Sequence, residues 1–298
     1  MLNVLRDWWS SLWSWLQPGD RAPRVTAIGD DWRVPELALR QLNEVPLRIE
    51  AGLELLPLVD PSQGGKVIDT LGRMRASIAE DLGWVFPGAQ FSDNPRLPPL
   101  GYRIFIWGHA VAEGQVMPGM VGIAPDRLTP EQRQVAKVGE RPKTGELVAW
   151  VPQTVEEARR MGLAADEMML EHLEHVLRQQ MYRFVTPESL SMTLETRLRH
   201  YGRELADELL SRFITRGELL FCFRELLRAG RSLREFPQVI EALYRHCHSR
   251  SHEAATSSDA MFGMALQIPQ FSPRELAEAT CREMGWPSLD ERMRPLPG

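Results

Sequence analysis

The stretch that decides the fold is residues 47–119, LRIEAGLELLPLVDPSQGGKVIDTLGRMRASIAEDLGWVFPGAQFSDNPRLPPLGYRIFIWGHAVAEGQVMPG. Residues 46–59 alternate well enough to predict one or two strands. After a turn at 60–65, apolar residues recur at helical spacing over 67–82, and Gly83 ends that predicted helix. The strict alternation of 102–107 predicts a strand, and we expect 110–115 and 121–124 to follow as two more. This stretch is therefore of mixed α/β type.

Downstream of this stretch, apolar residues recur mostly at the spacing of a helix. Thr129 caps a short predicted helix that Gly139 ends, and 147–151 is strand-like. Beyond about residue 165 the pattern predicts only helices and polar connections, so the chain as a whole is of the α+β class. The expected helices cover 168–180, a segment capped by Thr186, 205–213, 218–228, a segment with a Ser232/Glu235 capping box, and a last one from Ser272 to Gly285, with 249–260 as a polar linker.

The spacing of apolar residues over 1–17 predicts an amphipathic helix, which carries four tryptophans, Trp8, Trp9, Trp13 and Trp15. Residues 18–43, which are rich in Pro, Gly and Asp, are expected to be a linker. The tryptophan stripe has three interpretations: docking to a partner or second copy, packing on the body of the same chain, or contact with a membrane surface. The polar face has a single Arg balanced by an Asp, whereas membrane-surface helices usually carry several basic residues. We therefore favour docking.

Composition excludes several classes of protein. The chain has 298 residues, 43% of them hydrophobic, and a net charge of −5 that is spread over both halves. Such a chain can bury a core, but it has no basic domain for nucleic acid. Three widely spaced cysteines give no disulfide framework, which favours a cytoplasmic location. No apolar run reaches the ~18 residues that span a bilayer, so we expect no transmembrane segment and at most peripheral membrane contact.

The motifs of common enzymes and metal proteins are missing or incomplete. Lys66 follows two glycines but is not followed by Ser or Thr, so the phosphate-loop pattern fails. His172 and His175 are three residues apart, whereas a zincin helix needs a spacing of four. His246, Cys247, His248 and His252 form a group of soft ligands without a second half-site. We therefore expect no catalytic residue, no cofactor and no resident metal, and an enzyme that uses a cleft of the fold is the less favoured alternative.

Several spaced elements of residues 44–248 resemble one family. They are the segment from Gly52 to Asp60, the turn Gly64-Gly65, the Arg-containing helix ending at Gly83, Asp93-Asn94 and the strand from Tyr102 to Gly108. Further matches follow in the strand Leu147-Val148-Ala149-Trp150-Val151, in Glu171-His172-Leu173 and in the helical pair from Phe213 to Leu243. In this order they resemble the cytoplasmic domain of the large export-gate protein of type III secretion, the FHIPEP family.

The resemblance implies an architecture. Residues 44–98 and 144–184 would form a split α/β subdomain, 99–143 an inserted RRM-like β-rich subdomain, and 185–248 a helical subdomain, with 249–298 as a linker and C-terminal helix. Family members also have a membrane domain before these parts and a last α/β subdomain after them, and we expect neither in this sequence.

The resemblance also implies a site. Flagellar members dock export chaperones with an Asp, a Phe and a Thr, and these positions correspond to Arg141, Thr144 and Glu167 here. Because none of the three residue types matches, we expect chaperone docking to be weak or lost. The expected function is non-enzymatic assembly through protein partners such as export-apparatus components, with the chain as a homo-oligomer. An adaptor outside secretion is the alternative.

Overall fold

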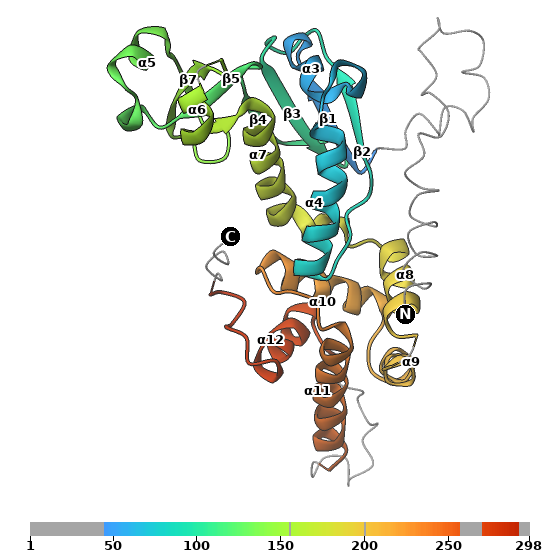
Figure 1. Ribbon diagram of the computed structural model, residues 1–298. Helices are drawn as coiled ribbons and strands as arrows, with labels where there is room; N and C mark the ends of the chain where they lie inside the picture. Colours follow the sequence, from blue (N-terminus) through green and yellow to red (C-terminus); the bar gives the residue numbers. More distant parts are fainter. Residues whose placement is uncertain (1–44, 155, 200, 257–269, 292–298) are drawn as a thin grey trace, which may run out of the picture. The chain divides into compact units, whose positions relative to one another are not determined.

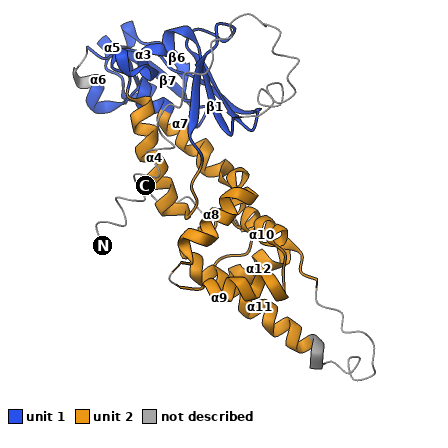
Figure 2. Cartoon of the chain, turned by 90° about the vertical axis from the view of Figure 1, so that its right-hand side faces the viewer, with its two compact units in different colours: residues 1–65, 87–169 blue, residues 66–86, 170–298 orange. Residues whose placement is uncertain are grey.

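The computed structural model describes residues 45–154, 156–199, 201–256 and 270–291, which mix helices and strands (Figure 1). These residues belong to two compact units (Figure 2). Unit 1 holds the described residues up to Gly65 together with Pro87–Met169, and unit 2 holds Lys66–Phe86 together with those from Leu170 onward. The α+β class predicted from the sequence is confirmed.

Unit 1 contains two four-stranded sheets. The first has the strand order β2-β1-β3-β4, in which β1 and β2 are parallel and the other pairs are antiparallel. Buried and half-buried residues alternate along β1 and β3, as in a sheet with one covered face. The strand predicted at 102–107 is therefore confirmed. The bounds are β1 Leu47–Ala51, β2 Ala89–Asp93, β3 Gly101–Ile106 and β4 His109–Gln115.

The second sheet has the order β6-β7-β5-β8 and is antiparallel throughout. Its core is formed by Val121, Ile123 and Val151, against which Leu128 and Met161 pack. The bounds are β5 Met120–Ile123, β6 Lys137–Glu140, β7 Leu147–Pro152 and β8 Leu163–Ala164, with η4 Pro125–Arg127, α5 Pro130–Val135 and α6 Glu156–Met161 between them.

The strand pairing differs from the predicted division into subdomains. β3 lies within 99–143, which was expected to form a separate insertion, yet five of its six residues pair with β1. β5 also lies in that range but pairs with β7, which was assigned to the split subdomain. The predicted boundaries follow the order of motifs in the chain, whereas hydrogen bonds between distant strands decide which segments share a sheet.

Two local expectations in unit 1 are corrected. Only Leu47–Ala51 of the segment 46–59 is a strand; η2 Leu53–Leu55, α3 Leu56–Val59 and η3 Pro61–Gln63 follow. Leu55 and Val59 are four residues apart and both buried. This spacing places the two side chains on the same face of a helix. The helix capped by Thr129 ends at Val135 rather than near Gly139, which lies in β6. A Cβ at Gly139 would stand 2.8 Å from the Trp150 indole nitrogen, so glycine lets β6 lie flat against that ring.

Unit 2 is helical, and the helices predicted at 67–82, 168–180, 218–228 and after Ser272 are present. The unit boundary at 169/170 falls inside α7. The bounds are α4 Val67–Leu82, α7 Ala165–Gln180, η5 Met181–Phe184, α8 Pro187–Arg197, α9 Arg203–Arg212, α10 Arg216–Arg228, α11 Phe236–Thr256 and α12 Pro273–Glu283.

Aromatic rings pack together in the core of unit 2. Phe223 on α10 meets Trp84 at 6.1 Å and Phe236 at 5.4 Å between ring centres, both edge to face. The Trp84 indole also donates to the Phe184 carbonyl at 3.3 Å. The segment after α4 is thus built into the helical core. The three cysteines, which the sequence separates widely, are all buried here on different helices, and burial raises the pKa of each thiol.

The C-terminal end of α4 is fixed by the loop before α11. The Leu233 amide donates to the Leu82 carbonyl at 2.8 Å, and Arg197 donates to the carbonyls of Gly83 at 2.8 Å and Leu233 at 3.0 Å. Gly83 has a φ of 69°, and a Cβ there would overlap the Leu233 carbonyl carbon. This position therefore requires glycine for two reasons, its left-handed backbone and the close approach of another segment.

The helix after Ser232 also differs from expectation. The Ser232 hydroxyl donates to the Asp81 carbonyl at 2.5 Å instead of closing a capping box. The helix begins at Phe236, which places Pro237 in the first turn where its missing N–H costs nothing. It continues to Thr256, so 249–256 is helical rather than linker. The rest of the expected linker, 257–260, lies outside the described residues.

We predict that Gly83→Ala lowers the free energy of unfolding by roughly 2–4 kcal/mol, because the left-handed backbone disfavours alanine and the added methyl group displaces Leu233. Urea denaturation followed by circular dichroism measures the change. Gly72→Ala on the same helix is the matched control: a Cβ there meets nothing within 4 Å, so the variant should be about 0.5–1 kcal/mol more stable. Equal effects of the two substitutions would contradict the argument.

Candidate functional site

The sequence-predicted partner residues fall into three places. Trp8, Trp9, Trp13 and Trp15 lie outside the described residues. Arg141 and Thr144 lie together in the turn between β6 and β7, where the Arg141 carbonyl accepts from the amides of Thr144 at 3.2 Å and Gly145 at 2.8 Å. The Thr144 hydroxyl donates to the Glu146 carboxylate at 3.0 Å, which closes the turn.

Glu167 is not part of that turn. It lies in the first turn of α7, where its carboxylate accepts from the Ala164 amide at 2.9 Å. Ala164 ends β8, and β8 and β6 are the two opposite edges of the second sheet. The structure therefore brings Arg141 and Thr144 together and leaves Glu167 at the far edge. Its observed role is to satisfy a backbone donor at a helix start.

The turn that carries Arg141 rests on the first sheet of unit 1. A Cβ at Gly114 of β4 would stand 2.8 Å from the Pro142 Cβ and 2.6 Å from the Tyr102 hydroxyl. Glycine at this position thus allows the β6–β7 turn to approach β4 closely. Arg141 and Thr144 are accordingly held where the two sheets of unit 1 meet.

A different surface in unit 2 gathers side chains typical of protein interfaces. We call it the arginine–aromatic face, and it consists of Tyr182, Arg183, Phe221, Arg224 and Arg228. Phe221, Arg224 and Arg228 recur at i, i+3 and i+7, so they share one side of α10. Phe221 is 51% exposed, although its neighbours Cys222 and Phe223 are fully buried.

The charged and aromatic groups of this face are stacked on one another. The Arg224 guanidinium lies 5.3 Å from the centre of the Phe221 ring, and the Arg228 guanidinium lies 4.6 Å from that of Tyr182. Arg183 is 6.0 Å from the same tyrosine ring. Each guanidinium thus lies over an aromatic ring at cation–π distance, an arrangement that orders long side chains.

A hydrogen bond and an ion pair hold two arginines of the face in place. Arg224 Nε donates to the Val185 carbonyl at 2.9 Å, just beyond η5, and Arg228 pairs with Glu225 at 3.0 Å. Burial, and then the charge of Arg228, lowers the pKa of Arg224 from its usual value. Arginine remains charged at neutral pH even so. The face thus presents the guanidinium groups of Arg224 and Arg228, one of which is paired with Glu225.

This chemistry suits the recognition of an acidic protein surface. Arginine binds carboxylates through two parallel N–H donors, and aromatic side chains supply large apolar area at low entropic cost. Aromatic residues and arginine are enriched in the buried centres of interfaces. The spacing of Phe221, Arg224 and Arg228 is visible in the sequence, but only the burial of the neighbouring residues shows that they face outward.

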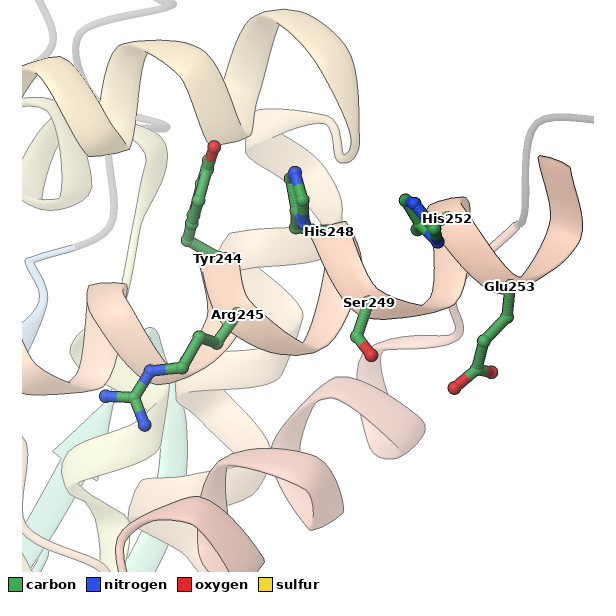
Figure 3. A pocket seen from close by; sticks show the side chains of 6 residues that line it. All are labelled: Tyr244, Arg245, His248, Ser249, His252 and Glu253. Atoms are coloured by element: carbon green, nitrogen blue, oxygen red, sulfur yellow. The ribbon is translucent and has the colours of Figure 1, made fainter. Parts of the chain in front are cut away.

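Groups suited to acid–base or metal chemistry do not converge in the described residues. Those residues contain no group of three or more metal-ligating side chains. The carboxyl pKa values of Asp60 and Glu131 are lowered by hydrogen bonds within helix caps. An open hollow lies along α11 beside Tyr244, His248 and His252 (Figure 3). Over the same described ranges, no helix is both long and apolar enough to cross a bilayer.

Comparison with known proteins identifies the family. Residues 20–262 match the FHIPEP family. This chain belongs to it. The flagellar biosynthesis protein FlhA of Yersinia enterocolitica is 25% identical over 276 residues, which are 86% of this chain and 38% of that protein. FlhA of Bacillus subtilis is 25% identical over 220 residues, 72% of this chain and 32% of the relative. The FHIPEP chain therefore spans about a third of the length of these relatives.

Solved structures share the fold. The Chlamydia pneumoniae CdsV protein matches 80% of this FHIPEP chain and 66% of its own, with a TM-score of 0.61 and 18% identity. A nonameric SctV-C structure from EPEC matches 81% of this chain and 65% of its own, with a TM-score of 0.54 and 11% identity. The family resemblance read from the sequence is confirmed.

We predict that His172 makes the fold of unit 2 sensitive to acid. Burial, helped by His175 and opposed by Glu171, lowers the pKa of His172 to about 4. The unfolded chain takes up this proton near pH 6.5 and the folded chain does not. The titration of His172 therefore leaves the free energy of unfolding unchanged above pH 6.5 and lowers it by about 3 kcal/mol as the pH drops to about 4. Urea denaturation at several pH values measures the slope.

His172→Gln is the matched variant for that measurement, because glutamine keeps a polar side chain but does not titrate. Its stability should depend less on pH than that of the wild type over the same interval. Parallel slopes for the two proteins would assign the acid sensitivity to other groups.

Proposed function

We propose that this chain acts as the cytoplasmic part of a type III export gate and works by binding proteins and assembling with copies of itself. The observation that carries the proposal is the arginine–aromatic face on a fold of the FHIPEP family. Such a face is suited to a protein partner. A net charge of −5 gives no support to nucleic-acid binding.

The solved relatives support assembly and partner binding. One is described as the nonameric EscV cytosolic domain from the type III secretion system, and another as a complex of the Chlamydia pneumoniae CdsV and CdsO proteins. By extension, we propose a cytoplasmic homo-oligomer that recruits other components of an export apparatus. Catalysis has no part in the proposal.

The face on α10 would act by stacking and charge together. A partner that covers Phe221 removes its exposed ring from water, and a carboxylate on the partner would meet Arg224 and Arg228. Because both guanidinium groups are already held against rings, binding freezes few rotamers. The face is therefore the element of unit 2 that we assign to docking.

An adaptor role outside secretion is the second candidate. Arg141, Thr144 and Glu167 stand at positions that the family resemblance assigns to chaperone docking, but their residue types differ and the structure separates Glu167 from the other two. We propose that chaperone docking of the flagellar kind is lost here. An export gate without that contact, or an adaptor with other partners, fits these residues.

We predict that Phe221→Ala weakens association of the full chain at least about tenfold, because a half-exposed aromatic anchor is lost. Arg224→Glu should weaken it further at low salt and less at high salt, as expected for a charged contact. Analytical ultracentrifugation over a range of concentrations gives the association constant.

Val138→Ala is the control for an exposed apolar residue, since Val138 lies in unit 1 and is 73% exposed. Its association constant should equal that of the wild type. If Phe221→Ala and Arg224→Glu also match the wild type, the face does not mediate self-association, and the export-gate proposal would have to rest on other surfaces.

We also predict that removing residues 1–18 reduces the mass of the assembly or abolishes capture of a partner. Four tryptophans can each bury roughly 150–250 Å², and a helix of this length is marginal alone in water. Light scattering of the full and shortened chains measures the mass. If the full chain is already monomeric at high concentration and captures nothing that the shortened chain loses, the N-terminal segment packs on its own chain.

A further inference from the structure

His248 and His252 are the two histidines in the sequence that are four residues apart. Both lie on α11 and both are exposed. Figure 3 shows their imidazole rings projecting from the same side of the helix as Tyr244, whereas Arg245, Ser249 and Glu253 project from the other. Side chains at i and i+4 of a helix have Cβ atoms about 5–6 Å apart. The two rings are thus neighbours on one helix face.

The structure divides the group of soft ligands that the sequence places at 246–252. The His246 ring turns inward and meets the Phe271 ring at 5.8 Å. Cys247 is fully buried, and burial raises the pKa of its thiol to about 12, so it is not available as a thiolate. The inward pair therefore serves the core of unit 2, whereas His248 and His252 are exposed on the surface of α11.

Two imidazoles at this spacing can share one metal ion. A zinc–nitrogen bond is about 2.0–2.1 Å long, and paired histidines four apart on a helix are a known way to reach one ion from the same face. The rings border an open hollow of about 340 Å³, which has room for the water molecules that would complete the coordination. In the described residues no third ligating side chain joins them.

The His248 ring is held in place by aromatic neighbours. It stacks on Tyr244, with 5.7 Å between the ring centres and 28° between the planes, and it meets Phe213 edge to face at 6.3 Å. Arg250 and Glu253, on the same helix, pair with each other at 3.7 Å. One imidazole is therefore pre-oriented, and an ion that binds it finds the second at high local concentration.

We propose that His248 and His252 form an open, exchangeable site for one divalent transition-metal ion of the class Zn²⁺, Ni²⁺ or Cu²⁺. Imidazole nitrogen favours these ions over Mg²⁺ and Ca²⁺, which need oxygen ligands. With two protein ligands the ion is readily removed by a chelator, so the protein need not carry it after purification. The site is separate from the arginine–aromatic face and does not rest on the proposed docking function.

The test uses the full chain, treated with a chelator, dialysed and titrated with Zn²⁺ or Ni²⁺ alone by calorimetry. The wild type should bind one ion and melt at a higher temperature when the ion is present, while Mg²⁺ should do neither. His252→Ala should weaken binding by about a hundredfold, because the chelate is lost. Since His248 also packs on Tyr244, His252 is the better residue to replace.

A composition-matched variant makes the test sharper. His252→Ala combined with Glu253→His keeps the number of histidines but places the second ring on the other side of α11, so it should bind as weakly as His252→Ala. His175→Ala, which removes an imidazole from α7, should bind as the wild type does. Circular dichroism confirms that each variant is folded. Equal affinity of all four proteins, or no saturable binding by the folded wild type, would overturn the proposal.

Discussion

Unit 2 depends on arginine side chains that donate to backbone carbonyls in the loops that connect its helices. Arg197 reaches the carbonyls of Gly83, Leu233 and Arg234, and so joins the end of α4 to a loop 150 residues later in the chain. Arg75 donates to the Phe86 carbonyl at 2.8 Å, and fully buried Arg231 donates to those of Ser288 and Glu291 at 2.6 Å. Carbonyls in a loop have no partner from a helix or strand ladder, and a buried one without a partner is costly. A planar guanidinium with five donors can satisfy several of them at once, which the point charge of lysine cannot do as well.

This constraint explains how a discontinuous segment becomes part of a helical unit. Residues 66–86 lie between strands of unit 1 in the sequence but belong to unit 2. Trp84 and Phe86 pack on aromatic rings from η5 and α10, and the hydrogen bonds of Arg197 fix the direction in which the chain leaves α4. Without Gly83 the loop at Leu233 could not approach, and Arg197 would lack two of its acceptors. A chain with 32 arginines and three lysines is well supplied for such contacts.

Local signals predicted the elements of this fold better than their grouping. The helix from Val67, the strand from Tyr102 and the caps at Thr129, Thr186 and Ser272 follow from periodicity and capping, which involve residues close in sequence. The pairing of β1 with β3 joins residues 51 to 59 apart, and that of β5 with β7 joins residues 26 to 32 apart. No pattern within either strand specifies its neighbour. The helical turns at 53–59 were predicted as strand for the same reason. Which of their side chains are buried depends on the sheet beside them, and that sheet is built from distant parts of the chain. The site was harder to predict than the fold, because Arg141, Thr144 and Glu167, which the family resemblance groups together, lie at opposite edges of a sheet.

The arginine–aromatic face and the carbonyl contacts have a common physical basis. Arg224 takes part in both, since its Nε donates to the Val185 carbonyl while its guanidinium carbon lies over the Phe221 ring. An arginine anchored in this way has already lost much of its rotamer freedom on folding, so little remains to be lost when a partner binds. The same anchoring keeps a half-exposed phenylalanine covered on one side, which limits its exposure to water in the free protein. A surface that is ordered before binding and rich in arginine can thus be kept stable in the unbound chain and still offer strong contacts to an acidic partner.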